Sequence, residues 1–269
     1  MKTLNAVYHH INILSLDVAA GAVICALFFA RIFQVSVSLA ALTALCLTVW
    51  IVYTIDHLRD ATSISKAACT DRHRFHQKYF KAVSITLLVI MVLDFVVIWF
   101  LPRRMLMLGL MLWIVVLGYL VLQRYLKFLK EFFVACLYTA GILLPSLALI
   151  TEDLQTVHYI LTGKFFITAL MNLLLFSLFD YKEDRNQQQH SFVTWFGPAS
   201  TRKGILLLGL INILSGIRLW SFDPGVAIIF ISMNIMLLMI LFFQRPLRSN
   251  NYYRKLGDAV FFIPLFYLL

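Results

Sequence analysis

Charged residues are scarce in this sequence. Only 13% of the 269 residues are Asp, Glu, Lys or Arg, whereas 61% are hydrophobic, and the mean hydropathy is +0.86. A water-soluble domain of this length has too little polar surface in such a composition to cover its apolar side chains. The composition therefore excludes a soluble protein and predicts a single integral membrane domain over residues 1–269.

Paired cysteines and alternating strand patterns are also missing. The four cysteines are Cys25, Cys46, Cys69 and Cys136. Their spacing fits neither a zinc site nor a disulfide framework, and we interpret all four as reduced. The apolar runs are continuous, whereas a membrane barrel alternates polar and apolar residues. We therefore expect an all-α, polytopic membrane helical bundle.

Nine apolar runs of roughly 20 residues, the length that spans a bilayer, predict nine transmembrane helices. We interpret them as two sets of four helices and a last helix. They are expected near 11–31, 36–55, 80–101, 105–122, 131–150, 159–179, 203–221, 224–243 and 257–269. The first run is expected to be an anchor and not a cleaved signal, because Lys2 is a small basic flank and Asp17 interrupts the run.

The net charge of +10 has an uneven distribution. Most lysines and arginines fall in the N-terminus and in the loops expected on its side of the membrane. Basic loops mark the cytoplasmic side, so we expect a multi-pass protein of a bacterial cell membrane with a cytoplasmic N-terminus. Because this pattern accounts for the basicity, no nucleic-acid partner is expected.

Acidic residues number only thirteen, and four of them form two copies of one pattern. Asp56 and Asp60 follow the second apolar run, and Asp180 and Asp184 follow the sixth. Residues four apart share one face of a helix, and both pairs belong to the predicted cytoplasmic side. A single Asp-x-x-x-Asp is most often a solvated turn, but two at equivalent positions favour a shared site.

Converging carboxylates at helix C-termini repel one another and require a compensating cation. Oxygen ligands select a hard ion such as Mg²⁺, which also keeps water and substrate phosphate oxygens as ligands. Basic residues near both pairs provide groups that bind phosphate oxygens: Lys66, Arg72, Arg74, Lys78, Lys182 and Arg185. The sequence therefore predicts a Mg²⁺–diphosphate site at the membrane border, with a lipid tail between helices.

These stretches resemble the two aspartate motifs of the UbiA superfamily of membrane prenyltransferases, which have nine helices. The Asn-x-x-x-Asp-x-x-x-Asp positions of the first motif hold Val52, Asp56 and Asp60. The three Asp positions of the second motif hold Asp180, Asp184 and Gln188. Further similarity lies in Ser191 through Gly197, in Lys130-Glu131, and in Gly141 and Pro145 of the fifth predicted helix.

The resemblance implies an enzyme that transfers a polyprenyl group from its diphosphate to a lipophilic acceptor, expected to be aromatic. In that reading Asp56, Asp60, Asp180 and Asp184 hold Mg²⁺ and support the departure of diphosphate. Aromatic faces would shield the allylic cation. Tyr119 and Tyr138 are candidates for this role, although packing is the more frequent role of such residues.

Two motif positions depart from the family pattern. Val52 has no group that binds a metal ion, and Gln188 offers only a neutral oxygen. A non-catalytic UbiA-like protein that binds a lipid diphosphate therefore stays an alternative. A membrane transporter or structural protein is another, motivated by Asp17 and Asp94 inside predicted spans.

Near the C-terminus, Tyr252-Tyr-Arg254 is typical of an aromatic belt at the membrane surface.

Overall fold

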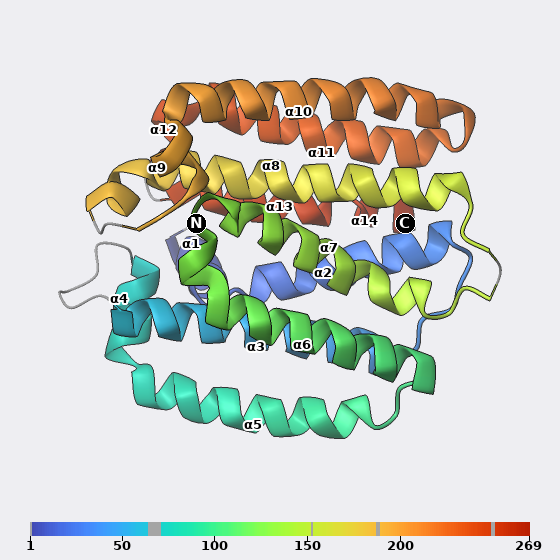
Figure 1. Ribbon diagram of the computed structural model, residues 1–269, viewed down its shortest axis with the longest axis horizontal. Helices are drawn as coiled ribbons and strands as arrows, with labels where there is room; N and C mark the ends of the chain where they lie inside the picture. Colours follow the sequence, from blue (N-terminus) through green and yellow to red (C-terminus); the bar gives the residue numbers. More distant parts are fainter. Residues whose placement is uncertain (1, 64–70, 152, 187–188, 249–250) are drawn as a thin grey trace.

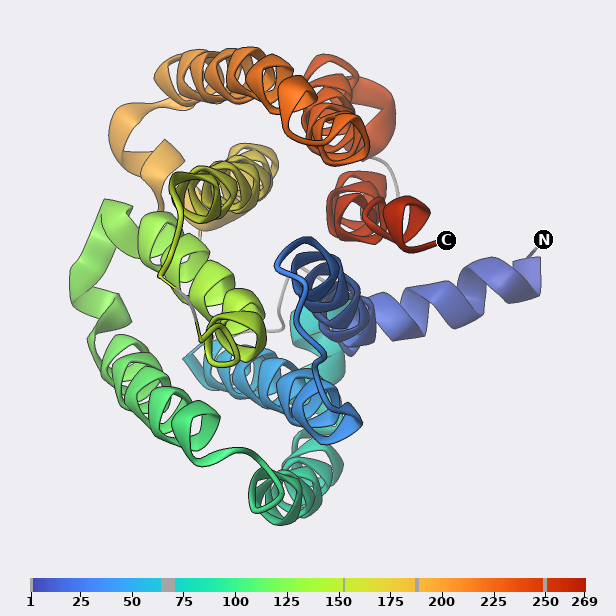
Figure 2. The same cartoon turned by 90° about the vertical axis from the view of Figure 1, so that its right-hand side faces the viewer.

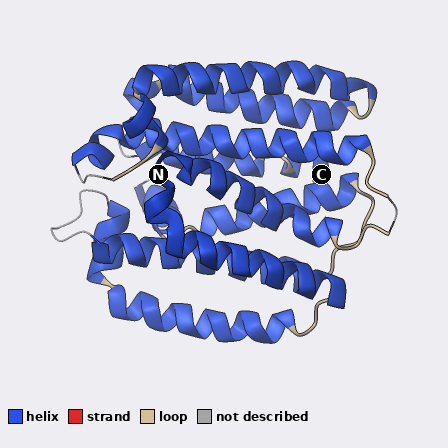
Figure 3. Ribbon diagram, viewed as in Figure 1, coloured by secondary structure: helices blue, strands red, loops and turns tan. Residues whose placement is uncertain are grey.

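Helices build the part of the chain that the computed structural model describes, which is residues 2–63, 71–151, 153–186, 189–248 and 251–269. Within these ranges no strand occurs (Figure 3), so the all-α prediction is confirmed. The elements are α1 Lys2–Ile13, α2 Leu16–Ile32, α3 Leu39–Ser63, α4 Asp71–Lys78, α5 Phe80–Ile98, α6 Arg103–Leu126, η1 Lys127–Leu129, α7 Lys130–Leu147, α8 Thr156–Asn186, α9 Phe192–Phe196, α10 Pro198–Arg218, η2 Leu219–Ser221, α11 Pro224–Phe242, α12 Gln244–Arg248, α13 Tyr252–Ala259, η4 Val260–Phe262 and α14 Leu265–Leu268.

Among the described residues, seven helices are long and apolar enough to cross a membrane: α3, α5, α6, α7, α8, α10 and α11. The chain is thus a multi-pass membrane protein. The first and last predicted spans are not single long helices in the structure. Ser15, with φ 55°, separates α1 from the 17-residue α2, and the C-terminal run is divided among α13, η4 and α14. The count of nine spans therefore stays a prediction.

The helices pack side by side along the long dimension of the molecule (Figure 1). Of the seven long helices α8 is the most buried and α5 the least. Figure 2 shows α1 extending away from the bundle, whereas the C-terminal helices lie alongside α2 and α11. This arrangement places α13 next to α8.

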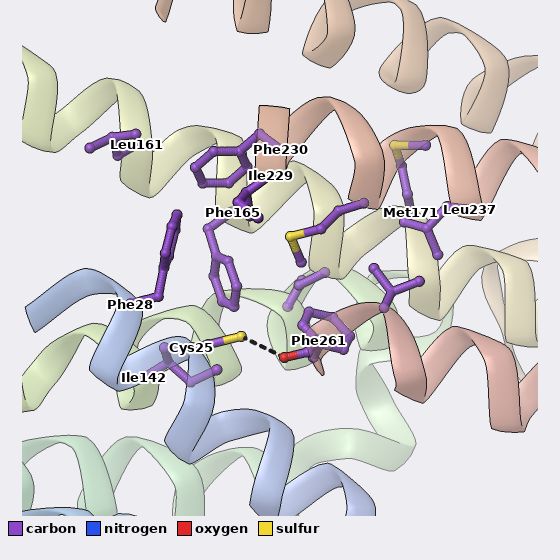
Figure 4. Close-up of a cluster of buried hydrophobic side chains, with 14 of the residues drawn as sticks. Cys25, Phe28, Ile142, Leu161, Phe165, Met171, Ile229, Phe230, Leu237 and Phe261 are labelled. Carbon is purple, nitrogen blue, oxygen red and sulfur yellow. Dashed lines mark hydrogen bonds between the residues drawn. The ribbon is translucent and has the colours of Figure 1, made fainter. Parts of the chain in front are cut away.

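A continuous apolar core joins the N-terminal and C-terminal helices. Phe28 of α2, Phe165 of α8 and Phe230 of α11 are each at most 1% exposed, and Figure 4 shows them converging with Phe261 of η4. The thiol of Cys25 donates a hydrogen bond to the Phe261 carbonyl oxygen at 3.3 Å. These contacts hold η4 against α2. Because α13 directly precedes η4 in the chain, they also fix the position of α13 in the bundle.

Candidate active site

Both aspartate pairs lie near the C-terminal ends of long helices. Asp56 and Asp60 belong to α3, which continues to Ser63, and Asp180 and Asp184 belong to α8, which continues to Asn186. A short helix follows each, α4 after α3 and α9 after α8. Figure 1 shows both short helices at the same end of the bundle. The helical continuity gives each pair the one-turn spacing expected from the sequence.

The four aspartates line one cavity of about 260 Å³. Two segments far apart in the sequence therefore supply carboxylates to a single site. The charged lining also includes Arg72, Lys130, Glu131, Arg254, Lys255 and Asp258. Carboxylates and cations are thus mixed in the wall, and the cations reduce the repulsion among the acids.

Lys130, the first residue of α7, links the two aspartate pairs. It interacts electrostatically with Asp56 and Asp60 of α3 and with Asp184 of α8. The next residue, Glu131, accepts a hydrogen bond from the backbone N–H of Phe192 at 2.9 Å. The start of α7 therefore provides a cation between the pairs and also holds the start of α9.

Asp180 is held by two residues of α13. Arg254 forms an ion pair with the Asp180 carboxylate, and the Tyr253 hydroxyl donates a hydrogen bond to it. Burial opposes the charged form of Arg254, but Asp180, Tyr253 and Asp258 together outweigh this effect and raise the arginine pKa. Burial, together with the Asp180 charge, raises the pKa of Tyr253 to about 12. The sequence placed Tyr253 and Arg254 in an aromatic belt at the membrane surface. For these two residues that prediction is wrong, because both side chains line the cavity.

Asp56 and Asp184 have polar neighbours from other elements. The Gln123 amide Nε2 of α6 donates to Asp56 Oδ1 at 3.4 Å, and the Tyr119 hydroxyl donates to Gln123 Oε1 at the same distance. Ser191, which precedes α9, provides a hydrogen bond to Asp184. Side chains from α6 and from the segment before α9 thus orient the carboxylates of α3 and α8.

The structure places the predicted phosphate-binding cations in different locations, and not all of them line the aspartate-lined cavity. Arg72 lines the cavity, and burial together with the nearby Arg254 lowers its pKa. Arg74 and Lys78 line a different groove, beside α1, α2 and α5. Lys182 and Arg185 are exposed on α8 and do not line the cavity. Lys66 and the motif residue Gln188 lie outside the described residues. The role of all six cations in diphosphate binding stays a prediction.

Sequence reasoning missed Arg254 as a cavity residue and treated Lys130 only as part of a family likeness. Both lie at the edge of an apolar run, where a basic residue is usually read as a membrane-border residue. For Arg254 the available signal was Asp258, one helical turn further on. An acid inside the last apolar run of a chain with so few acids indicates a polar neighbour.

An apolar cavity of about 210 Å³ adjoins the aspartate-lined cavity. The two cavities share the wall residues Tyr53, Asp56, Tyr119, Val134 and Tyr138. From there the apolar cavity follows α3, α6 and α7 toward Met105 and Pro145. The polar site at the end of the bundle therefore shares a wall with an apolar space between helices.

Comparison with solved structures identifies similar folds. The apo structure of a UbiA homologue from Aeropyrum pernix K1 gives a TM-score of 0.68 at 12% identity, covering 97% of this chain and 98% of that chain. A UbiA homologue from Archaeoglobus fulgidus bound to GPP and Mg²⁺ gives 0.67 at 12% identity, covering 96% and 99%. A structure of a UbiA homologue from Archaeoglobus fulgidus bound to DMAPP and Mg²⁺ gives 0.64 at 12% identity, covering 95% and 98%. No protein-family model and no curated protein matches the sequence. Over nearly its whole length, the chain has the fold of the UbiA homologues.

Proposed function

We propose that this chain is a UbiA-type prenyltransferase. It binds the diphosphate of a prenyl donor in the aspartate-lined cavity and transfers the prenyl group to a lipophilic acceptor within the membrane. The observation that carries the proposal is the shared wall of the two cavities. Asp56 and three tyrosines lie at the junction between a charged chamber and an apolar one, which suits a molecule with a charged head and an apolar tail.

The donor set of the cavity fits Mg²⁺. The candidate ligands are carboxylate oxygens of Asp56, Asp60, Asp180 and Asp184, and Mg²⁺ commonly takes one or two carboxylates together with water and substrate phosphate oxygens. Within the described ranges, no three His, Cys, Asp or Glu side chains are grouped closely enough to hold an ion by themselves. An ion bound by these aspartates would also take water and substrate phosphate oxygens as ligands. When bound, Mg²⁺ would neutralise charge on the diphosphate leaving group.

The chain itself provides positive charge and a dry, aromatic environment. Lys130 and Arg254 lie in the cavity wall among the aspartates, where a guanidinium and an ammonium group bind phosphate oxygens. The prenyl tail would lie along the apolar cavity, which excludes water from the reacting carbon. Tyr53, Tyr119 and Tyr138 surround the junction where the head meets the tail, and aromatic faces there stabilise an allylic cation.

Binding of labelled geranyl diphosphate to the purified chain in lipid nanodiscs tests the proposal. The wild type should bind it with Mg²⁺ and much more weakly with EDTA. Asp56→Asn and Asp180→Asn should each weaken Mg²⁺-dependent binding by about tenfold or more, the scale of one lost charge-assisted contact. Asp223→Asn is the matched control, because Asp223 is also half-buried and accepts a hydrogen bond from the Tyr267 hydroxyl, but it lines neither cavity. Unchanged binding in both site variants would contradict the proposal.

A second candidate is a protein that binds a lipid diphosphate without turnover. Val52 supports it, because this residue lies in the apolar wall next to the aspartates and has no metal-binding group. The same preparation separates the two functions. Release of diphosphate and formation of a prenylated product indicate the enzyme, whereas tight binding without either product indicates the binder. In the second case Val52→Asn should restore turnover if this position is the cause.

A further inference from the structure

A large groove on the side of the bundle takes no part in the proposed reaction. Its volume is about 900 Å³, more than three times that of the aspartate-lined cavity. Its walls come from α1, α2, α3, α4 and the first half of α5, on the side of the molecule where α1 extends outward (Figure 2). Leu16 and Tyr79 of this wall are 44% and 43% exposed. The groove therefore opens away from the core, toward the space that lipid occupies around a membrane protein.

The basic residues of the groove lie at one end of it. Arg74 and Lys78 come from α4, where residues four apart share one face of the helix. His9 and His10 come from α1. His9 also lines the aspartate-lined cavity, which places the basic end of the groove at the same end of the bundle as the aspartates. The Lys78 ammonium lies over the Tyr79 ring, 5.1 Å from its centroid.

The charge of the groove differs from that of the cavity. Among the described residues that line the groove there is no Asp or Glu, whereas the wall of the aspartate-lined cavity mixes carboxylates with cations. Guanidinium and ammonium groups bind phosphate oxygens, and basic pockets between transmembrane helices bind acidic lipid head groups. The basic end of the groove is therefore complementary to a phosphate anion.

From its basic end the groove follows one face of α5. Tyr79, Val83, Thr86 and Ile90 line it and are three or four residues apart. At 1.5 Å per residue this face is about 16 Å long, which is about half of a hydrocarbon core of about 30 Å. Helices α2 and α3 add further apolar side chains, among them Trp50. The groove thus has the depth of one leaflet and a lining that suits an acyl chain.

We propose that this groove is a binding site for an anionic phospholipid. The lipid phosphate contacts Arg74 and Lys78, and an acyl chain lies along α5. A zwitterionic phospholipid with the same chains fits the apolar wall equally well, but its ammonium group would lie near two cations. The site therefore selects lipids by the charge of the head group. It is separate from the proposed diphosphate site, and lipid binding here does not depend on the proposed function.

Two lipids with the same chains test the site: dioctanoyl phosphatidylglycerol, which is an anion, and dioctanoyl phosphatidylcholine, which is zwitterionic. The full chain is purified in a neutral detergent, and native mass spectrometry gives the dissociation constant of the first bound molecule of each lipid. The wild type should bind phosphatidylglycerol about tenfold more tightly, the scale expected of two cations near one acidic head group.

Charge variants test the basic end. Arg74→Gln combined with Lys78→Gln should abolish the preference for phosphatidylglycerol. Lys81→Gln is the matched control, because Lys81 is an exposed cation of α5 that does not line the groove. The control should keep the preference, since a general attraction of lipid to surface charge is all that it removes.

A second pair of variants tests the apolar wall. Ala82 lines the groove near its basic end, so Ala82→Trp places a large side chain where the acyl chain would lie. Phosphatidylglycerol should then bind about tenfold more weakly, because apolar contacts of the chain are lost. Ile85→Trp is the control, because Ile85 is 66% exposed on α5 and does not line the groove.

Equal binding of the two lipids by the wild type overturns the inference. So does a preference that survives the loss of both Arg74 and Lys78, or an Ala82→Trp variant that binds phosphatidylglycerol as tightly as Ile85→Trp does. If a variant does not fold, the wild-type comparison decides by itself. None of these measurements uses a prenyl diphosphate, so their failure would leave the proposed function untouched.

Discussion

At the scale of single residues, the site shows how converging carboxylates are compensated by the chain itself. The sequence predicted a compensating cation, Mg²⁺, for four acids at helix C-termini, where the helix dipole is also unfavourable. The structure adds two cations to that account. Lys130 lies between the pairs, and Arg254 is paired with Asp180, with side chains 25% and 16% exposed, respectively.

Breaking the Asp180–Arg254 pair on one side should destabilise the protein. Arg254→Gln leaves a partly buried carboxylate without its cation, and we expect the free energy of unfolding to fall by about 1–3 kcal/mol. Asp180→Asn combined with Arg254→Gln should recover part of that loss, because no unpaired charge remains. Thermal unfolding of the four variants of this cycle, in one detergent, measures the coupling. Additive effects in the double variant would show that the pair contributes no interaction energy.

At the scale of secondary-structure elements, the site depends on how closely α13 approaches α8. Gly257 makes this approach possible, since a Cβ atom there would lie 2.5 Å from both Asn172 Oδ1 and Phe176 Cε1. The stacked rings of Tyr253 and Phe179, with centroids 4.3 Å apart, continue the same contact toward the aspartates. The position of Arg254 and Asp258 in the cavity is therefore a consequence of close helix packing.

Gly257→Ala should push α13 away from α8. Overpacking of this kind typically costs about 1–3 kcal/mol, so the melting temperature should fall and geranyl diphosphate binding should weaken with it. Gly163→Ala is the matched control on α8, because nothing lies within 4 Å of a Cβ atom at that position. The control should change stability by less than about 1 kcal/mol. Equal effects of the two substitutions would indicate that the α8–α13 contact is not tight.

At the scale of the whole molecule, the two cavities share a wall, and together they mark a path from the end of the bundle toward its apolar interior. The aspartates mark the polar end, and the space between α3, α6 and α7 forms the apolar part. Under the proposed function, the aspartate-lined cavity holds the diphosphate of the donor and the apolar cavity holds its prenyl tail. The length of the apolar part then limits the length of the prenyl chain.

Gly109→Leu should shorten that path. Gly109 lines the apolar cavity, and a Cβ atom there meets nothing within 4 Å, so the larger side chain has room to enter without displacing a neighbour. Geranyl diphosphate should then bind about tenfold more weakly, since apolar contacts of its second isoprene unit are lost, whereas dimethylallyl diphosphate should bind as before. Gly118→Leu on the same helix is the control, because Gly118 does not line the cavity. Equal losses for both diphosphates would contradict this assignment of the tail.

The sequence by itself determined the membrane class, the helical architecture and the two aspartate pairs, because hydropathy and one-turn spacing are local properties of the chain. Only the tertiary structure decided which cations meet the aspartates. Arg254 reaches Asp180, and Asp258 reaches Asn12, through contacts between segments that are 74 and 246 residues apart in the sequence. Such contacts follow from the packing of α13 between α2 and α8, and no local pattern encodes that packing. The helix interruptions around Ser15 and Pro264 were not predicted either, since each lies in a mainly apolar run that is long enough for a single helix.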